Sequence, residues 1–138
     1  MNEQENTRIV QQCYKLFKSG DIQALLDLFS EDIDFQMPEI ENVPFSGKHR
    51  GREATARFFK LVSESQDVLE FDPQEFIVQG DKVVVLGNSL YRVKAGGREY
   101  GGEWAHVWTV RGGKVLASKE YLDTAASAAA YQQAARAR

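Results

Sequence analysis

Three glycine-containing pairs divide the second half of the sequence into four segments of similar length. The pairs are Gly80-Asp81, Gly96-Gly97 and Gly112-Gly113, and each is typical of a tight turn between antiparallel strands. The segments that they bound are expected to be strands at residues 68–78, 81–93, 99–111 and 114–123. The sequence therefore predicts a four-stranded antiparallel meander.

The first half of the sequence has helical periodicity instead. Apolar residues recur every three or four positions from Thr7 to Phe29, with one break at Ser19-Gly20-Asp21. Gly20 is suited to ending a first helix, and Asp21 to capping the amides of a second. We therefore expect a helical hairpin at the N-terminus.

Three further elements complete the predicted fold. Alternation from Asp32 to Met37 predicts a short strand, the segment from Gly51 to Val62 predicts a third helix, and the alanine-rich stretch from Thr124 to Ala137 predicts a closing helix. This order favours an α+β fold: a cone-shaped, curved antiparallel sheet covered by three N-terminal helices, with a short C-terminal helix. We expect residues 1–138 to form one domain.

Composition excludes several classes of function. With 17 Lys and Arg against 20 Asp and Glu, the net charge of -3 gives no basic field for nucleic acid. One cysteine and two histidines are too few for a structural zinc cluster, and no dinucleotide or phosphate loop is present. No apolar stretch has the length of a membrane span. We expect a cytoplasmic protein without metal or cofactor.

Four motifs, taken in order, resemble one family. They are Ser19-Gly20-Asp21, the helix exit Phe29-Ser30-Glu31-Asp32, Gly51-Arg52-Glu53-Ala54, and Val110-Arg111-Gly112-Gly113-Lys114-Val115. In this order the chain resembles the SnoaL-like polyketide cyclase and ketosteroid isomerase-like branch of the nuclear-transport-factor-2-like superfamily. The resemblance implies a pocket inside the cone, and a homodimer formed through the sheet. It does not select a reaction, because the fold carries many activities.

The last predicted hairpin supplies the residues for a site. A two-residue turn at Gly112-Gly113 makes His106 face Lys119 and Trp104 face Tyr121 if the ladder is regular. Alternation then predicts a pocket face with the following side chains: Trp104, His106, Trp108, Lys119, Tyr121 and Asp123. Glu120 falls on the opposite face, near the expected dimer interface.

Two of these side chains are candidates for catalysis. His106 has an imidazole that exchanges protons near neutral pH, and the alternative is a half-buried histidine bonded within the sheet. Asp123 ends the last strand, where related cyclases are expected to keep an acid or base. Its alternative role is to cap the alanine-rich helix. Both alternatives stay open at this stage.

Other residues are candidates for ligand binding, with ordinary core packing as the alternative. Phe35 and Met37 are placed at the mouth of the pocket, and Phe17 and Phe59 at its floor. Asn88 is a polar residue in an apolar strand. Tyr14 lies one residue from the position at which the isomerase tyrosine would align. Trp104, Trp108 and Tyr121 are expected to form the walls.

Two hypotheses of function follow. The first is a cofactor-free enzyme that binds an apolar carbonyl or hydroxyl compound and catalyses isomerisation, cyclisation, hydration or dehydration, with Asp123 and His106 as proton carriers. The second is a noncatalytic ligand-binding or dimerisation module of the same fold. An open cavity reached by both side chains favours the first, and a cone filled by its own aromatic rings, or Asp123 turned onto the amides of 125–127, favours the second.

Overall fold

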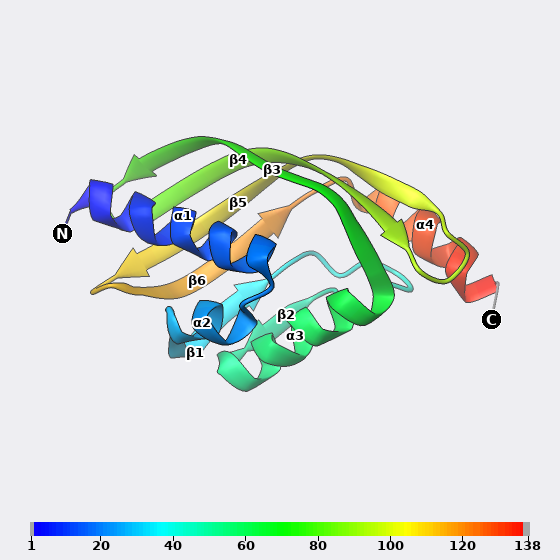
Figure 1. The fold of residues 1–138 in the computed structure, drawn as a ribbon, viewed down its shortest axis with the longest axis horizontal. Coiled ribbons are helices and arrows are strands. Elements are labelled where there is room, and N and C mark those ends of the chain that lie inside the picture. Colours follow the sequence, from blue (N-terminus) through cyan, green and yellow to red (C-terminus); the bar gives the residue numbers. More distant parts are fainter. Residues whose placement is uncertain (1, 137–138) are drawn as a thin grey trace.

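The computed structural model describes residues 2–136 as a curved six-stranded sheet with helices on its concave side (Figure 1). The elements follow in chain order: α1 (Glu3–Ser19), α2 (Ile22–Asp27), β1 (Phe29–Gln36), β2 (Lys48–Arg50), α3 (Gly51–Ser65), β3 (Gln66–Gln79), β4 (Lys82–Val93), β5 (Glu99–Arg111), β6 (Lys114–Tyr121) and α4 (Thr124–Arg136). The predicted α+β class and the helices are confirmed.

Local signals account for the helical hairpin at the N-terminus. The Asn2 side chain accepts hydrogen bonds from the amides of Gln4 and Glu5, which starts α1. Gly20 ends that helix in the left-handed conformation, at a φ of 77°. Asp21 then accepts a bond of 3.2 Å from the Ala24 amide and so caps α2, as predicted.

The sheet has the strand order β2-β1-β6-β5-β4-β3. Strands β3 to β6 form the predicted antiparallel meander. Two details differ from the prediction. β1 pairs in parallel with β6, which corrects the expectation of an antiparallel sheet, and β2 is a strand in a segment for which we predicted none. A parallel pair needs a long connection, and here nearly the whole chain between β1 and β6 supplies it.

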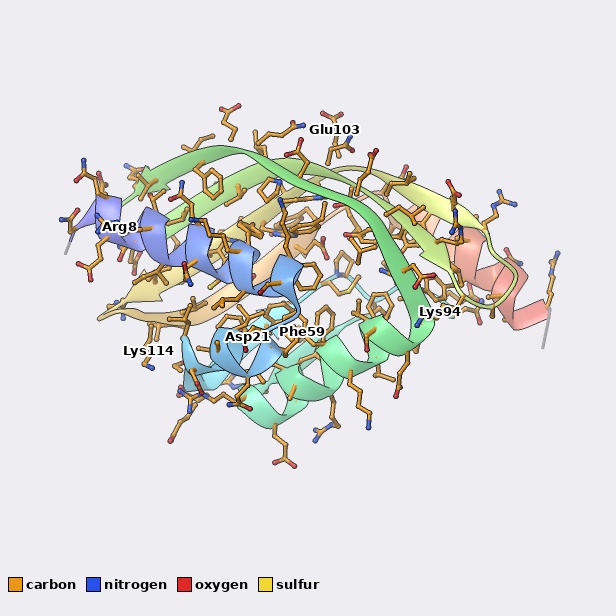
Figure 2. All side chains as sticks on the ribbon, in the orientation of Figure 1. Arg8, Asp21, Phe59, Lys94, Glu103 and Lys114 are labelled. Carbon is orange, nitrogen blue, oxygen red and sulfur yellow. The ribbon has the colours of Figure 1, made fainter. Side chains whose placement is uncertain are left out.

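The core fills the space between the concave face and helices α1 to α3. Fully buried apolar side chains come from both layers, among them Val10 and Leu25 from the helices and Val83, Val85 and Val110 from the sheet. Figure 2 shows Phe59 between the helices and the sheet, with Arg8, Glu103 and Lys114 at the periphery. No helix within residues 2–136 is both long and apolar enough to cross a membrane.

Candidate functional site

A cavity of about 100 Å³ lies between the concave face of the sheet and the helices. Most of its wall is apolar and aromatic, and the rings come from every layer: Phe17, Phe35, Phe45, Phe58, Phe59 and Phe71. An apolar cavity of about 150 Å³ holds benzene, and one water occupies roughly 30 Å³ of liquid. The space therefore fits a few waters or a compound slightly smaller than one aromatic ring.

Four polar side chains on one side of this cavity form a continuous hydrogen-bonded chain. Trp108 donates through Nε1 to the Tyr14 hydroxyl at 2.9 Å. That hydroxyl lies 2.8 Å from His106 Nδ1. His106 Nε2 lies 2.9 Å from Oε2 of Glu120, so the chain ends on a carboxylate. We call these four residues, Trp108, Tyr14, His106 and Glu120, the polar relay.

Aromatic rings hold the imidazole of the polar relay in place. The Trp104 ring stacks on His106 at a centroid distance of 4.0 Å and an interplanar angle of 17°. Tyr14 stacks on the same imidazole at 5.8 Å. Trp104 is itself anchored, because its Nε1 donates to the Ser89 hydroxyl at 2.6 Å and its ring stacks on Phe71 at 5.3 Å. The His106 ring is therefore fixed before any ligand arrives.

Burial keeps the Tyr14 hydroxyl protonated. Desolvation raises the pKa of its hydroxyl far above the ordinary value; the Glu120 charge adds to this, and the hydrogen bond from Trp108 opposes it. Tyr14 therefore stays a neutral O–H donor. As a carboxylate, Glu120 only accepts, so the facing Nε2 of His106 carries a proton.

Two proton arrangements then satisfy the polar relay. With neutral His106, Tyr14 donates its proton to Nδ1. With protonated His106, Nδ1–H donates to the Tyr14 oxygen, which also accepts from Trp108. The Tyr14 proton is then free to point into the cavity.

The register predicted for the last hairpin is wrong. The turn itself agrees, with Arg111 opposite Lys114 and Val110 opposite Val115, but Thr109 then pairs with Ala117 rather than with Leu116. This bulge places one extra residue in β6 and reverses the alternation beyond it. His106 consequently faces Glu120, and Trp108 faces Ser118.

The bulge changes which carboxylate enters the cavity. Glu120 lines it, not the outer face where we expected this residue. Asp123 lies outside it and accepts a hydrogen bond of 3.0 Å from the Ala126 amide, as a cap of α4 does. The expectation that Asp123 and His106 share one cavity is therefore wrong, because Asp123 lies beyond the bulge and at the start of a helix.

The remaining predicted side chains divide into two groups. Those that line the cavity are Tyr14, Phe17, Phe35, Met37, Phe59, His106 and Trp108. Trp104 is buried but acts through its stacking on His106, not as a wall. Asn88 is exposed, and Tyr121 is 48% exposed. The last two were expected to face the ligand, and the alternation of β4 and the bulge of β6 place them on the outside.

Several polar lining residues were not expected from the sequence. Besides Glu120, these are Gln36, Gln66, Tyr91, Tyr100, Ser118 and Ser127. Tyr91 on β4 and Tyr100 on β5 are direct cross-strand partners, so their side chains lie on the same face of the sheet. Alternation along the two strands could have assigned both to the cavity face. Within residues 2–136, no three His, Cys, Asp or Glu side chains gather in a way that would hold a metal ion.

A curved sheet that encloses an apolar cavity with helices on its concave side defines the nuclear-transport-factor-2-like class of protein. The chain belongs to the SnoaL-like domain family, whose model matches residues 10–117. The fold and the family therefore agree with the resemblance seen in the sequence motifs.

Solved structures support this assignment. An NTF2-like protein from Burkholderia xenovorans LB400 is 37% identical, with a TM-score of 0.86 over 95% of this chain and 98% of that one. TerC, co-crystallized with polyporic acid, is 26% identical, with a TM-score of 0.83 over 93% and 98%.

A candidate polyketide cyclase from Xanthomonas campestris pv. campestris is 20% identical, with a TM-score of 0.78 over 95% of this chain and 99% of that one. At that identity the likeness concerns the fold alone. No curated protein matches the sequence.

Proposed function

We propose that this protein binds a small, mostly apolar carbonyl or hydroxyl compound and moves a proton on it by acid-base chemistry. The reactions in reach are isomerisation, cyclisation, hydration and dehydration. The observation that carries the proposal is the pairing of His106 with Glu120 at the wall of an aromatic cavity. Their side chains are only 12% and 21% exposed, so both act where water is scarce.

Glu120 is the proposed base. Its Oε2 is held by His106, and its carboxylate makes no other hydrogen bond within residues 2–136. The second oxygen is thus available to take a proton from a carbon beside a carbonyl. His106 fixes the orientation of the carboxylate and balances its charge when protonated.

Tyr14 is the proposed hydrogen-bond donor to the carbonyl oxygen of the bound compound. When His106 is protonated, the Tyr14 hydroxyl is released from the imidazole and can donate to the carbonyl oxygen on which negative charge develops. The pair of electrons left by the abstracted proton moves onto that oxygen. Return of the proton from Glu120 to another carbon would complete an isomerisation, with no net change in oxidation state.

The experiment uses cyclopentanone, a single-ring ketone with exchangeable protons beside its carbonyl. The protein is incubated with cyclopentanone in D₂O, and loss of the α-proton signal is followed by NMR. We expect faster exchange than in buffer, and a fall to about the buffer rate in Glu120→Gln. The matched control is Glu103→Gln, which alters an exposed carboxylate on β5. Exchange at the wild-type rate in Glu120→Gln would exclude Glu120 as the base.

One observation favours a second candidate, the noncatalytic ligand-binding module. Aromatic side chains leave a cavity of only about 100 Å³, and the relay groups satisfy one another's hydrogen bonds. Such a module would bind cyclopentanone without accelerating its exchange. The same NMR measurement therefore separates the two functions.

We also propose that two copies associate through the outer face of the sheet. Direct cross-strand pairing aligns Leu86, Ala105 and Tyr121 on this face, and Leu86 is 38% exposed. The apolar row favours burial against a second copy. Light scattering should give a dimer for wild type and a monomer for Leu86→Glu. A monomeric wild type would contradict the proposal.

A further inference from the structure

Gln66 has an amide that is fixed on one side and unpartnered on the other. The residue begins β3 directly after α3 and is 5% exposed. Its Oε1 accepts two hydrogen bonds, from the Tyr100 hydroxyl at 2.5 Å and from the Tyr131 hydroxyl at 2.6 Å. A carbonyl oxygen has two lone pairs, so this oxygen has no capacity for a ligand.

The other end of the same amide is free. Within residues 2–136, no hydrogen bond satisfies the two N–H groups on Nε2 of Gln66. Among the residues that the structure describes, the side-chain oxygen of Ser30 is the polar atom that is fully buried without a hydrogen-bond partner. The Gln66 nitrogen is unpaired but not sealed, so it borders space that a water-sized molecule can enter. Water can accept the protons of this amide, and an acceptor oxygen of a bound molecule can replace that water.

The surroundings of Gln66 identify that space. The cavity and a wide surface groove between α1, α3 and β3 share five lining residues: Phe17, Phe59, Val62, Gln66 and Phe71. Four of these are apolar, and Gln66 is the one with hydrogen-bond donors. The shared residues form the partition between the groove and the cavity. They belong to α1, α3 and β3, whose arrangement Figure 1 shows.

We propose that the Gln66 amide is a binding site for an acceptor oxygen, a carbonyl or an ether, on the molecule that occupies the cavity. The proposal deepens the proposed function, on which it rests, by adding a second recognition point at the partition with the groove. A ligand would then carry one oxygen toward Gln66 and its reacting carbon toward Glu120. Purely hydrocarbon compounds of the same shape would be discriminated against.

Tyr100 and Tyr131 are positioning residues for this amide. Burial raises the pKa of both hydroxyls above the ordinary value, so both remain donors rather than phenolates. Both hydroxyls donate to the amide oxygen, so the N–H groups of Gln66 lie on the side of the amide away from the two tyrosines. Tyr131 belongs to α4, which gives the C-terminal helix a role in ligand recognition.

The test compares tetrahydrofuran-3-one with cyclopentanone, in which a CH₂ group replaces the ring oxygen. Both compounds keep the carbonyl that Tyr14 would bind, and the first carries a second acceptor oxygen for Gln66. Dissociation constants for both are measured by titration calorimetry on wild type, Gln66→Leu and Gln66→Glu. Because cyclopentanone is more hydrophobic, the informative quantity is the change in the ratio of the two constants between proteins. We expect the preference for tetrahydrofuran-3-one to fall roughly tenfold in both variants.

Gln66→Glu guards against loss of folding. Its carboxylate still accepts from both tyrosines but has no N–H donor. The matched control is Gln74→Leu, an exposed glutamine on the same strand, which should keep the wild-type ratio. An unchanged ratio in both Gln66 variants, or a wild type that binds neither compound, would overturn the proposal.

The Glu120 and Gln66 variants distinguish failure of the proposed catalytic function from failure of the Gln66 binding site. Glu120→Gln should lose proton exchange on cyclopentanone and keep the preference for tetrahydrofuran-3-one, whereas Gln66→Leu should lose that preference. If no protein accelerates exchange but the ratio still falls in the Gln66 variants, the binding site stands and the catalytic proposal fails.

Discussion

His106 and Glu120 are direct cross-strand partners on β5 and β6, with Nε2 of the imidazole 2.9 Å from Oε2 of the carboxylate. The pairing exists because a bulge near Leu116 displaces β6 by one residue relative to a regular hairpin. In the regular register Lys119 would face the imidazole, and no carboxylate would be within reach of it. One extra residue therefore determines whether the cavity holds a proton-accepting pair.

The Tyr14 hydroxyl should contribute to stability as well as to the site. Tyr14→Phe removes the acceptor of the Trp108 N–H and the partner of His106 Nδ1, both inside the protein. We expect the free energy of unfolding to fall by about 1–3 kcal/mol, measured by urea denaturation. Ser63→Ala, which removes an exposed hydroxyl on α3, serves as control and should change it by less than about 0.5 kcal/mol. Equal values for the two variants would contradict the polar relay.

Gly87 should be intolerant of a side chain. A Cβ at this position would lie 2.4 Å from the Trp104 ring and 2.7 Å from the Asp72 carbonyl oxygen. We expect Gly87→Ala to lower the free energy of unfolding by about 1–3 kcal/mol and to shift the tryptophan emission, because the ring stacked on His106 must move. The neighbouring Asn88→Ala is exposed and should do neither. Wild-type stability and emission in Gly87→Ala would show that the ring is not held there.

Asp123 should behave as a helix cap. Removal of its carboxylate in Asp123→Ala takes away the acceptor of the Ala126 amide and should cost about 1 kcal/mol in urea denaturation. Asp123→Asn keeps a capping oxygen and should stay close to wild type. Neither variant should change the rate of proton exchange on cyclopentanone. A large loss of exchange in Asp123→Asn would instead show that Asp123 takes part in catalysis.

Alkaline pH should destabilise the fold. Burial raises the pKa of Cys13 from 9.0 to about 12, and it also raises the pKa of four of the five tyrosines. Because these folded-state values exceed the unfolded ones, the stabilising contribution is complete below about pH 9 and is lost as the pH rises toward the folded values.

Urea midpoints measured from about pH 8 to pH 11 should therefore fall steadily above pH 9. The Cys13→Ala variant should lose part of this slope, because it lacks the thiol that ionises first on unfolding. A midpoint independent of pH across this range would show that the cavity wall is more hydrated than its burial implies.

Much of the fold could be predicted from sequence because its signals are local. Gly20 and Asp21 mark the helical hairpin, and the glycine pairs mark the turns of the meander. Strand β2 and the parallel pairing of β1 with β6 could not be predicted in this way. Both depend on contacts between segments distant along the chain, which no local pattern encodes.

The site was less predictable than the fold. Alternation placed His106 and Trp108 correctly, because β5 is regular across these positions. It failed at Glu120 and Tyr121, because a bulge reverses alternation and the stretch Val115-Leu116-Ala117 carries no glycine or proline that would mark one. Gln66 was missed because it lies where a helix passes directly into a strand, a boundary that sequence patterns locate poorly.

The central claim is that the carboxylate bonded to His106 is Glu120. The most direct measurement is the ¹⁵N NMR spectrum of the His106 ring in wild type, Glu120→Gln and Asp123→Asn across neutral pH. We predict that Glu120→Gln moves the ring-nitrogen shifts and that Asp123→Asn leaves them as in wild type. Shifts that respond to Asp123→Asn and not to Glu120→Gln would contradict the claim.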